Sequence, residues 1–356
     1  MANIVGFLQK NDKLLGDLRS FIRQARDDVA RTVNSALVML YWKVGERIRN
    51  DILHKKRGSY GEEILSTLSK QLSAEFGNGY SKINLSRMVR FAESFPEEPI
   101  VSTLSRQLGW SLFVEIIPLK DEIQREFYSE MCRVERWSVR TLRKKIAGML
   151  YERTALSKKP AELAKEELAG LREEDKLTPD LIFRDPYFLD FLGLKDTYGE
   201  KDLETAILRE MEAFILELGA GFTFVERQKR ITVDGDDFYL DLLFYHRKLH
   251  RLVAIELKLE KFKPAYKGQM ELYLRWLEKY EKEAGEFPPI GLILCATKSE
   301  EQIELLQLGK SGIRVAAYVT ELPPREVLQK KLHEAVQLAR GRLEQRYIRH
   351  LPESKP

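Results

Sequence analysis

The spacing of hydrophobic residues changes about halfway along this chain of 356 residues. Over 1–50 and 60–153, apolar side chains recur every three or four positions, which is the spacing of amphipathic helices. After a further helical pattern over 200–219, short runs of branched and aromatic residues favour β-strands. The pattern therefore predicts an N-terminal all-helical domain followed by a mixed β-sheet domain flanked by helices, an α+β or α/β fold.

Composition suggests where these parts meet. We expect a helical domain over 1–155 and a highly charged connector over 156–180. A sheet domain with a C-terminal helix should follow over 181–350. Within it we expect three meandering strands, a helix and two further strands.

The most informative stretch is 237–259, DFYLDLLFYHRKLHRLVAIELKL, which predicts two strands joined by a tight polar turn. Three charged residues, Asp241, Glu256 and Lys258, interrupt its apolar runs. A charge in a half-buried strand is costly unless it is paired or bound to a metal. These three residues therefore require an explanation.

A symmetrical hairpin would bring the three charges together. With the turn centred on Lys248 and Leu249, Asp241 lies opposite Glu256, with about 5 Å between their Cβ atoms. Lys258 is two residues beyond Glu256 and points to the same face. Two carboxylates this close repel unless a divalent cation lies between them, and oxygen ligands without His or Cys favour Mg²⁺ or Mn²⁺. The arrangement predicts a metal and lysine centre that hydrolyses phosphodiester bonds.

An Asp followed on the next strand by Glu-x-Lys resembles the PD-(D/E)xK nuclease superfamily, which implies a restriction-endonuclease-like fold. More closely, and over nearly its whole length, the chain resembles the bacterial YhcG-like family, in which a helical DUF1016-type domain precedes such a nuclease domain. One departure is that Tyr239 and Leu240, not Pro, stand before Asp241. By itself an E-x-K triplet arises often by chance in a chain with 32% charged residues, as a surface ion pair on an edge strand. The apolar setting VAIELKL and the cross-strand Asp favour a site.

The resemblance also implies supporting residues. Superfamily members usually place a Glu on the helix before the first strand, aimed at the metal, and Glu204 and Glu210 compete for this role. Glu204 aligns better with the apolar stripe of its helix. Gln269 and Tyr273, after E-x-K, form a Q-x-x-x-Y motif similar to one beside the active site of RecB-like nucleases, which implies a site-orienting role. The alternative is a routine amphipathic helix in which Tyr273 packs.

A second hairpin precedes the charged one. Asp234-Gly235 predicts its turn. Across this pair of strands Gln228 or Lys229 would lie near Asp241 and could contact phosphate.

Two basic patches in the helical half offer a surface for nucleic acid. A helix-turn-helix arrangement is predicted by two helical patterns that the turn GNGY separates. The second of these helices carries Lys82, Arg87 and Arg90. A later helix carries Arg143 and Lys144. The alternative is a helical bundle whose basic faces are merely solvated.

The charge distribution is uneven. Residues 1–160 hold 28 Lys and Arg against 19 Asp and Glu, and the remainder holds 31 against 36, so that the chain carries +4. A basic front half suits a polyanion partner. No run is long and apolar enough to span a bilayer, and two widely separated cysteines suit a reducing compartment. We therefore expect a cytoplasmic protein without a membrane partner.

Together these features predict a Mg²⁺-dependent nuclease, with Mn²⁺ as a substitute, that hydrolyses DNA delivered by the N-terminal helical domain. The expected catalytic residues are Asp241, Glu256, Lys258, Gln269 and Tyr273, and the expected metal ligands are Glu204, Asp241 and Glu256. The alternatives are a nuclease fold that binds DNA or protein without cutting, and a nuclease acting on RNA, although a recognition helix fits the major groove of DNA better than that of RNA. The sequence leaves open whether cutting is endo or exo, the DNA structure preferred and the process served (recombination, repair or defence). It also leaves the oligomeric state open, although paired cuts in duplex DNA favour a homodimer.

Overall fold

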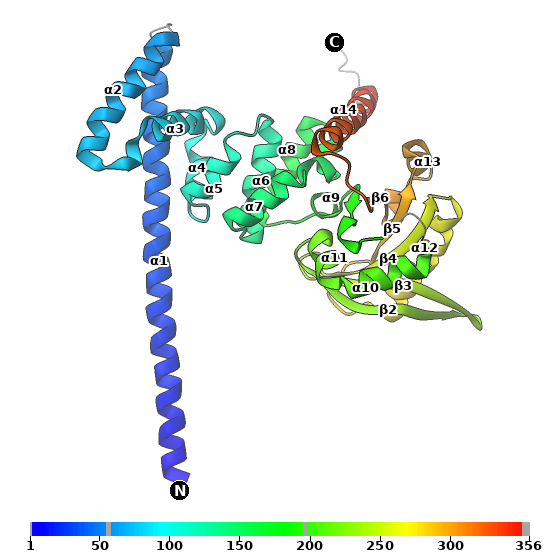
Figure 1. The fold of residues 1–356 in the computed structure, drawn as a ribbon. Helices are drawn as coiled ribbons and strands as arrows, with labels where there is room; N and C mark the ends of the chain where they lie inside the picture. Colours follow the sequence, from blue (N-terminus) through cyan, green and yellow to red (C-terminus); the bar gives the residue numbers. More distant parts are fainter. Residues whose placement is uncertain (1, 55–57, 195–197, 351–356) are drawn as a thin grey trace, which may run out of the picture. The chain divides into compact units, whose positions relative to one another are not determined.

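The computed structural model describes residues 2–54, 58–194 and 198–350. The chain divides into two compact units, residues 1–145 and 146–356 (Figure 1). The first is helical and the second contains a mixed sheet with helices, so the predicted fold class is confirmed. Helix α8 (Ala161–Glu174), inside the expected connector, belongs to the second unit. Among the described residues, no helix has the length and apolar character needed to cross a membrane.

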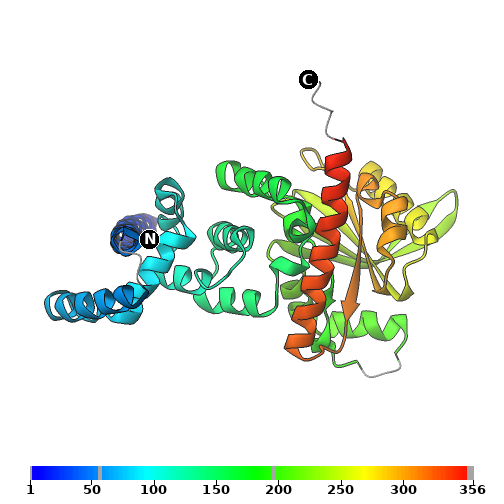
Figure 2. The same ribbon diagram turned by 90° about the horizontal axis from the view of Figure 1, so that it is seen from above.

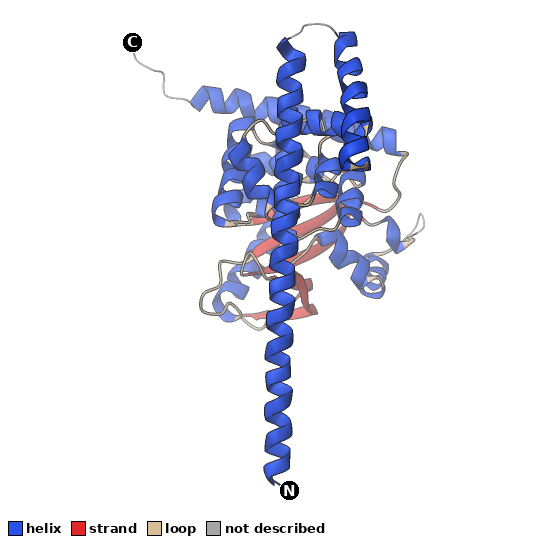
Figure 3. Cartoon of the chain, turned by 90° about the vertical axis from the view of Figure 1, so that its left-hand side faces the viewer, coloured by secondary structure: helices blue, strands red, loops and turns tan. Residues whose placement is uncertain are grey.

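The first unit is built around one long helix, α1, with shorter helices packed near its C-terminal end (Figure 3). Its helices are α1 (Ala2–His54), α2 (Gly58–Phe76), α3 (Lys82–Ser94), α4 (Glu98–Ser105), α5 (Trp110–Ile116), α6 (Glu122–Glu135) and α7 (Val139–Ala147). Ile48 of α1 packs with Leu85 and Met88 of α3 in one buried cluster. The indole of Trp42 donates to the carbonyl of Phe95 at 2.7 Å, so a buried polar group is satisfied where the helices meet.

Helices α2 and α3 are joined by the 3₁₀ turn Asn78–Tyr80. Gly77 adopts φ +85° at its start, a left-handed conformation that glycine tolerates without strain. The predicted pair of helices with a glycine-bearing turn is therefore present. Its use in DNA recognition stays a prediction.

Close packing of α1 on α3 depends on Gly45. A Cβ built on Gly45 would lie 1.8 Å from the carbonyl oxygen of Met88, which is backbone and cannot rotate away. The Gly45→Ala variant should therefore push the helices apart and destabilise the first unit by about 1–3 kcal/mol. Urea unfolding combined with hydrogen exchange of α3 amides would measure the loss.

Gly170→Ala in α8 is the matched control, since a Cβ there meets nothing within 4 Å. It should be neutral or slightly stabilising, because alanine favours helix. Equal behaviour of the two variants would contradict the packing argument.

The second unit contains a six-stranded sheet in the order β1-β6-β5-β4-β3-β2. The strands are β1 (Tyr187–Phe188), β2 (Phe222–Val233), β3 (Asp236–His246), β4 (Arg251–Lys261), β5 (Ile290–Thr297) and β6 (Ile313–Val319). β2, β3 and β4 form an antiparallel meander, and β4, β5, β6 and β1 are parallel. The predicted strand sequence is confirmed, with the short β1 in addition.

Helices complete the second unit. They are α8, α9 (Pro179–Ile182), α10 (Glu200–Arg209), α11 (Met211–Leu218), α12 (Ala265–Tyr280), α13 (Glu300–Leu305) and α14 (Arg325–His350). The single helix expected over 200–219 is divided at Glu210, whose ψ of +32° leaves the helical range. α14 packs beside the segment before α8, where Arg340 donates to the carbonyl of Ser157 at 2.7 Å (Figure 2).

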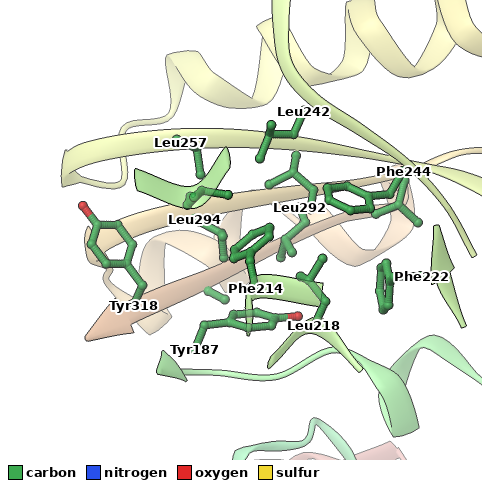
Figure 4. Close-up of a cluster of buried hydrophobic side chains, with 14 of the residues drawn as sticks. Tyr187, Phe214, Leu218, Phe222, Leu242, Phe244, Leu257, Leu292, Leu294 and Tyr318 are labelled. Atoms are coloured by element: carbon green, nitrogen blue, oxygen red, sulfur yellow. The ribbon is translucent and has the colours of Figure 1, made fainter. Parts of the chain in front are cut away.

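Two apolar cores cover the two faces of the sheet. On one face, Phe214 of α11 packs with Phe244 of β3 and Leu292 of β5 (Figure 4). On the other, Tyr273 of α12 packs with Ile293 of β5 in a separate cluster. Alternate residues of each central strand serve each core, which explains why these strands are apolar on both sides.

Candidate active site

The three charges of the central hairpin meet where β3 and β4 stop pairing. Their register runs from His246↔Arg251 to Leu242↔Ile255, which is the symmetrical hairpin predicted from the sequence. Asp241 and Glu256 follow immediately beyond the last pair. Beyond that pair, carboxylate side chains accept hydrogen bonds from backbone amides of the facing strand, in place of backbone carbonyls. The amide of Asp241 donates to Glu256 Oε1 at 3.3 Å, and the amide of Leu257 donates to Asp241 Oδ2 at 2.8 Å.

Glu256 is the most deeply buried charge of this group, with 3% of its surface exposed. Burial, and then the nearby carboxylate of Asp241, raise the pKa of Glu256 to about 7. The ammonium of Lys258 lies 3.0 Å from Glu256 Oε2. Burial alone would lower the pKa of Lys258, but the carboxylate of Glu256 outweighs it and the pKa is raised, so that Lys258 stays charged.

Glu204 reaches the same site from α10, by way of Gln228. The amide of Gln228 donates to Glu204 Oε2 at 3.0 Å and to Asp241 Oδ1 at 3.1 Å. Burial, and then Asp241, raise the pKa of Glu204. Glu210, its rival, instead lies 3.3 Å from Arg209 at the break between α10 and α11. The structure therefore brings Glu204, and not Glu210, to the charged cluster.

Gln228 holds an unusual backbone conformation for a residue within a strand. Its φ is +47°, in the left-handed region that costs a non-glycine residue of order 1–2 kcal/mol. The β2–β3 register places Gln228 between the pairs Arg227↔Leu242 and Lys229↔Leu240, opposite Asp241. The neighbouring Lys229 points elsewhere and forms ion pairs with Glu226 and Glu281, both at 3.0 Å.

Gln269 and Tyr273 of α12 contact each other and the strand that carries Asp241. Gln269 Nε2 donates to the phenol oxygen of Tyr273 at 2.7 Å, and that phenol donates to the carbonyl of Tyr239 at 3.3 Å. Tyr239 is two residues before Asp241. Tyr273 is 1% exposed, so it both packs in the core and ties α12 to the site.

The donor set suits a hard divalent cation. Within the described part of the chain, no three Asp, Glu, His or Cys side chains converge closely enough to form a ready-made metal cage. Instead, the amide of Gln228 separates Glu204 from Asp241, and Lys258 pairs with Glu256. Burial, and then the charge of Asp241, raise the pKa of Glu256, and a bound cation would offset both effects. The residues therefore fit Mg²⁺ or Mn²⁺ chemically.

The basic residues proposed to contact DNA lie on the first unit. Lys82 pairs with Glu62 at 3.1 Å, Arg87 donates to Asn84 at 3.2 Å, and Arg143 pairs with Glu115 at 2.7 Å. Arg90 and Lys144 are exposed. None of these five residues belongs to the charged cluster of the second unit.

Comparison with known proteins identifies the chain. Residues 180–333 match the family model described as YhcG PDDEXK nuclease domain, and residues 17–153 match that of the DUF1016 N-terminal domain. The chain is 32% identical to the Escherichia coli (strain K12) protein named "Putative nuclease YhcG", over 92% of this chain and 94% of that protein. The chain belongs to the YhcG family. As a YhcG-family protein it contains a nuclease domain of the PDDEXK type, a type that generally uses divalent metal ions.

Two solved structures are similar over part of this YhcG-family chain. A repair endonuclease from Pyrococcus abyssi is 22% identical, covering 36% of this chain and 50% of that one, with a TM-score of 0.25. The structure of an EndoMS-dsDNA2 complex is 17% identical, covering 36% and 49%, with a TM-score of 0.27.

Proposed function

We propose that this YhcG-family protein is a Mg²⁺-dependent nuclease that hydrolyses phosphodiester bonds in DNA. The observation that carries the proposal is the cluster at the divergence of β3 and β4. There Asp241, Glu256 and Lys258 lie together, with Glu204 linked to them through Gln228. Lys258 supplies one positive charge against these three carboxylates, so the cluster retains negative charge that a divalent cation would offset.

In this proposal Asp241, Glu256 and Glu204 hold the metal. When bound, Mg²⁺ supplies a Lewis acid that polarises the phosphate and increases the acidity of a water. The amide of Gln228, which donates to both Glu204 and Asp241, would hold these two carboxylates near each other at the metal position. Lys258 stabilises the negative charge that develops on the phosphate oxygens in the transition state, because its ammonium stays protonated beside Glu256.

Gln269 and Tyr273 have a positioning role in this proposal. Their hydrogen-bonded pair fixes the backbone of β3 at Tyr239, and hence the direction from which Asp241 enters the site. The N-terminal helical domain brings the DNA, through Lys82, Arg87, Arg90, Arg143 and Lys144. Contact with phosphates would replace the present partners of Lys82 and Arg143. The ion pair of Lys82 with Glu62 is exposed and therefore weak, and the side chain of Arg143 is itself exposed.

A cleavage assay tests the proposal. The purified chain would be incubated with linear, supercoiled, single-stranded and branched DNA, and with RNA, in the presence of Mg²⁺ or of EDTA. Metal-dependent cutting of DNA would support the proposal, and the preferred substrate would define its specificity. Cutting of RNA alone, or binding of DNA without cutting, would replace it by one of the two alternatives named above.

Metal binding should depend on pH through Glu256. Its carboxyl group must lose a proton to bind a cation, and its pKa in the free protein is about 7. The apparent affinity for Mn²⁺ should therefore fall by up to about tenfold for each pH unit below 7, and level off above it. Calorimetric titration from about pH 5.5 to about pH 8.5 would measure this dependence.

Glu256→Gln is the control for that titration. It removes the titrating group, so any remaining affinity should lose this pH dependence. An affinity of the unaltered protein that is constant over the same range would contradict the assignment of Glu256 as a ligand.

A further inference from the structure

A polar hollow of about 470 Å³ lies where the three parallel strands β4, β5 and β6 begin. Its walls include Arg251 at the start of β4, Pro289 just before β5, the 3₁₀ turn η5 (Leu308–Ser311) and one side of α12. Glu256 lies five residues further along β4, about 16 Å away at ~3.3 Å per residue. The hollow is therefore distinct from the candidate active site.

More cations than carboxylates line this hollow. The charged side chains in its wall are Arg251, Arg275, Lys310, Arg314, Glu271 and Glu278. Both carboxylates already have partners in the protein. Glu271 accepts a hydrogen bond from Ser311 Oγ at 2.6 Å, and this hydrogen bond is the main reason why the pKa of Glu271 is lowered. Glu278 lies 4.0 Å from the ammonium of Lys282.

Of the four cations that line the hollow, only one forms an ion pair with a residue that the structure describes. Arg314 pairs with Asp180 at 2.6 Å. Arg251, Arg275 and Lys310 have no carboxylate within ion-pair distance among the residues that the structure describes. Arg275 acts on Glu271 only beyond ion-pair distance, where its charge helps to lower the pKa of that carboxyl group, so the hollow carries three positive charges without a close ion pair among the described residues.

Arg251 is the cation for which this matters most, because it is half-buried. Its Nε donates to the carbonyl of Leu249 at 3.3 Å, and its guanidinium lies 5.2 Å from the ring centre of Phe287. Burial lowers the pKa of Arg251, and no acidic group offsets that effect. A partly desolvated guanidinium without an anion is unfavourable, so binding of an anion here would be stabilising.

We propose that this hollow binds a phosphate group through Arg251, Arg275 and Lys310. The planar fork of an arginine matches two phosphate oxygens, and Lys310 adds a mobile point charge. The volume is within the range of pockets that hold small ligands, and Leu274 and Ile290 supply apolar wall for the remainder of such a ligand. The phosphate belongs either to a free nucleotide or to a DNA backbone. The proposed site only binds this group, so it is an addition to the proposed hydrolysis at the candidate active site.

Binding measured in EDTA tests this proposal without any cleavage. Calorimetry with deoxyadenosine monophosphate and with inorganic phosphate would detect a free ligand. Fluorescence anisotropy with a short labelled duplex, over a series of NaCl concentrations, would detect a DNA backbone. Each measurement uses the full chain, the Arg275→Gln/Lys310→Gln variant and the control variant Lys330→Gln/Lys331→Gln. The control removes the same charge from exposed positions of α14, and thermal unfolding would verify that all three proteins are folded.

Two results support the site and one overturns it. Loss of nucleotide or phosphate binding by at least about tenfold, in the Arg275→Gln/Lys310→Gln variant alone, identifies a free ligand. Weaker duplex binding in that variant, with the slope of log K against log salt reduced by about 1–2, identifies a DNA backbone. If the two double variants behave alike with every probe, the proposal is wrong. A chain that binds through this hollow but never cuts would contradict the proposed function and leave this site intact.

Discussion

Replacing Glu256 by glutamine should reduce DNA cleavage by about a thousandfold or more, which corresponds to at least about 4 kcal/mol of transition-state stabilisation. Glutamine keeps the size of the side chain and can still accept the hydrogen bond from the amide of Asp241. It removes the charge that would bind the cation and that pairs with Lys258 at 3.0 Å. The loss should therefore appear in the rate of cleavage with Mg²⁺, whereas DNA binding in EDTA should change little.

Two further variants make this result specific. Glu204→Gln should also reduce cleavage, because Glu204 is linked through Gln228 to Asp241. Glu210→Gln should leave the rate within about twofold, because Glu210 pairs with Arg209 outside the cluster. Full activity of Glu256→Gln, or a loss for Glu210 in place of Glu204, would require a different site.

Replacing Glu217 by glutamine should destabilise the second unit by about 3–5 kcal/mol. Glu217 Oε2 accepts from Arg184 at 2.9 Å, and its Oε1 accepts from Arg153 and from the amide of Phe188. The side chains of both arginines are only 4% exposed. The variant would therefore leave two buried guanidinium groups without their carboxylate.

This network also predicts how stability responds to acid. Burial alone would raise the pKa of Glu217, but the two arginines outweigh it and the pKa is lowered below its unfolded value. A lowered folded-state pKa stabilises the protein above the unfolded pKa, and that contribution disappears as the pH falls through the folded pKa. The Glu217→Gln variant should accordingly lose less stability than the unaltered protein on acidification.

Urea unfolding followed by hydrogen exchange of β4 and β5 amides would report on the second unit by itself. Glu212→Gln is the matched control, since Glu212 is an exposed glutamate on the same helix. It should change stability by less than about 0.5 kcal/mol. A similar small change for Glu217→Gln would mean that solvent or neighbouring groups compensate the two arginines.

Local patterns were sufficient for the strands and for the hairpin register. Apolar and branched runs define β3 and β4, and the polar turn between them fixes which residues pair, as Leu242↔Ile255 confirms. The turn Asp234-Gly235 does the same for β2 and β3, with φ values of +50° and +90°. A strand alternates with a period of two, so a turn of known length determines the facing residues. That is why Asp241 and Glu256 could be placed together from the sequence.

The choice of partners beyond the hairpin depended on tertiary structure. Glu204 and Glu210 belong to the same helical pattern, and the break at Glu210 that separates their surroundings has no clear signal in the sequence. Gln228 was one of two neighbours expected near Asp241. Its left-handed φ, and the two hydrogen bonds by which its amide joins Glu204 of α10 to Asp241 of β3, are visible only in the tertiary structure.

The order of a helical part and a sheet part and the charged hairpin could be predicted from the chain, because each depends on patterns of residues that are close together in it. Which distant charges meet could be seen only once the chain was folded. The tertiary structure joined Arg153, Arg184 and Glu217 in one buried network, and it gathered Arg251, Arg275 and Lys310 at the start of the parallel strands. Such groups come from segments far apart in the sequence, and their proximity is set by how the sheet and its helices pack, which no local periodicity records.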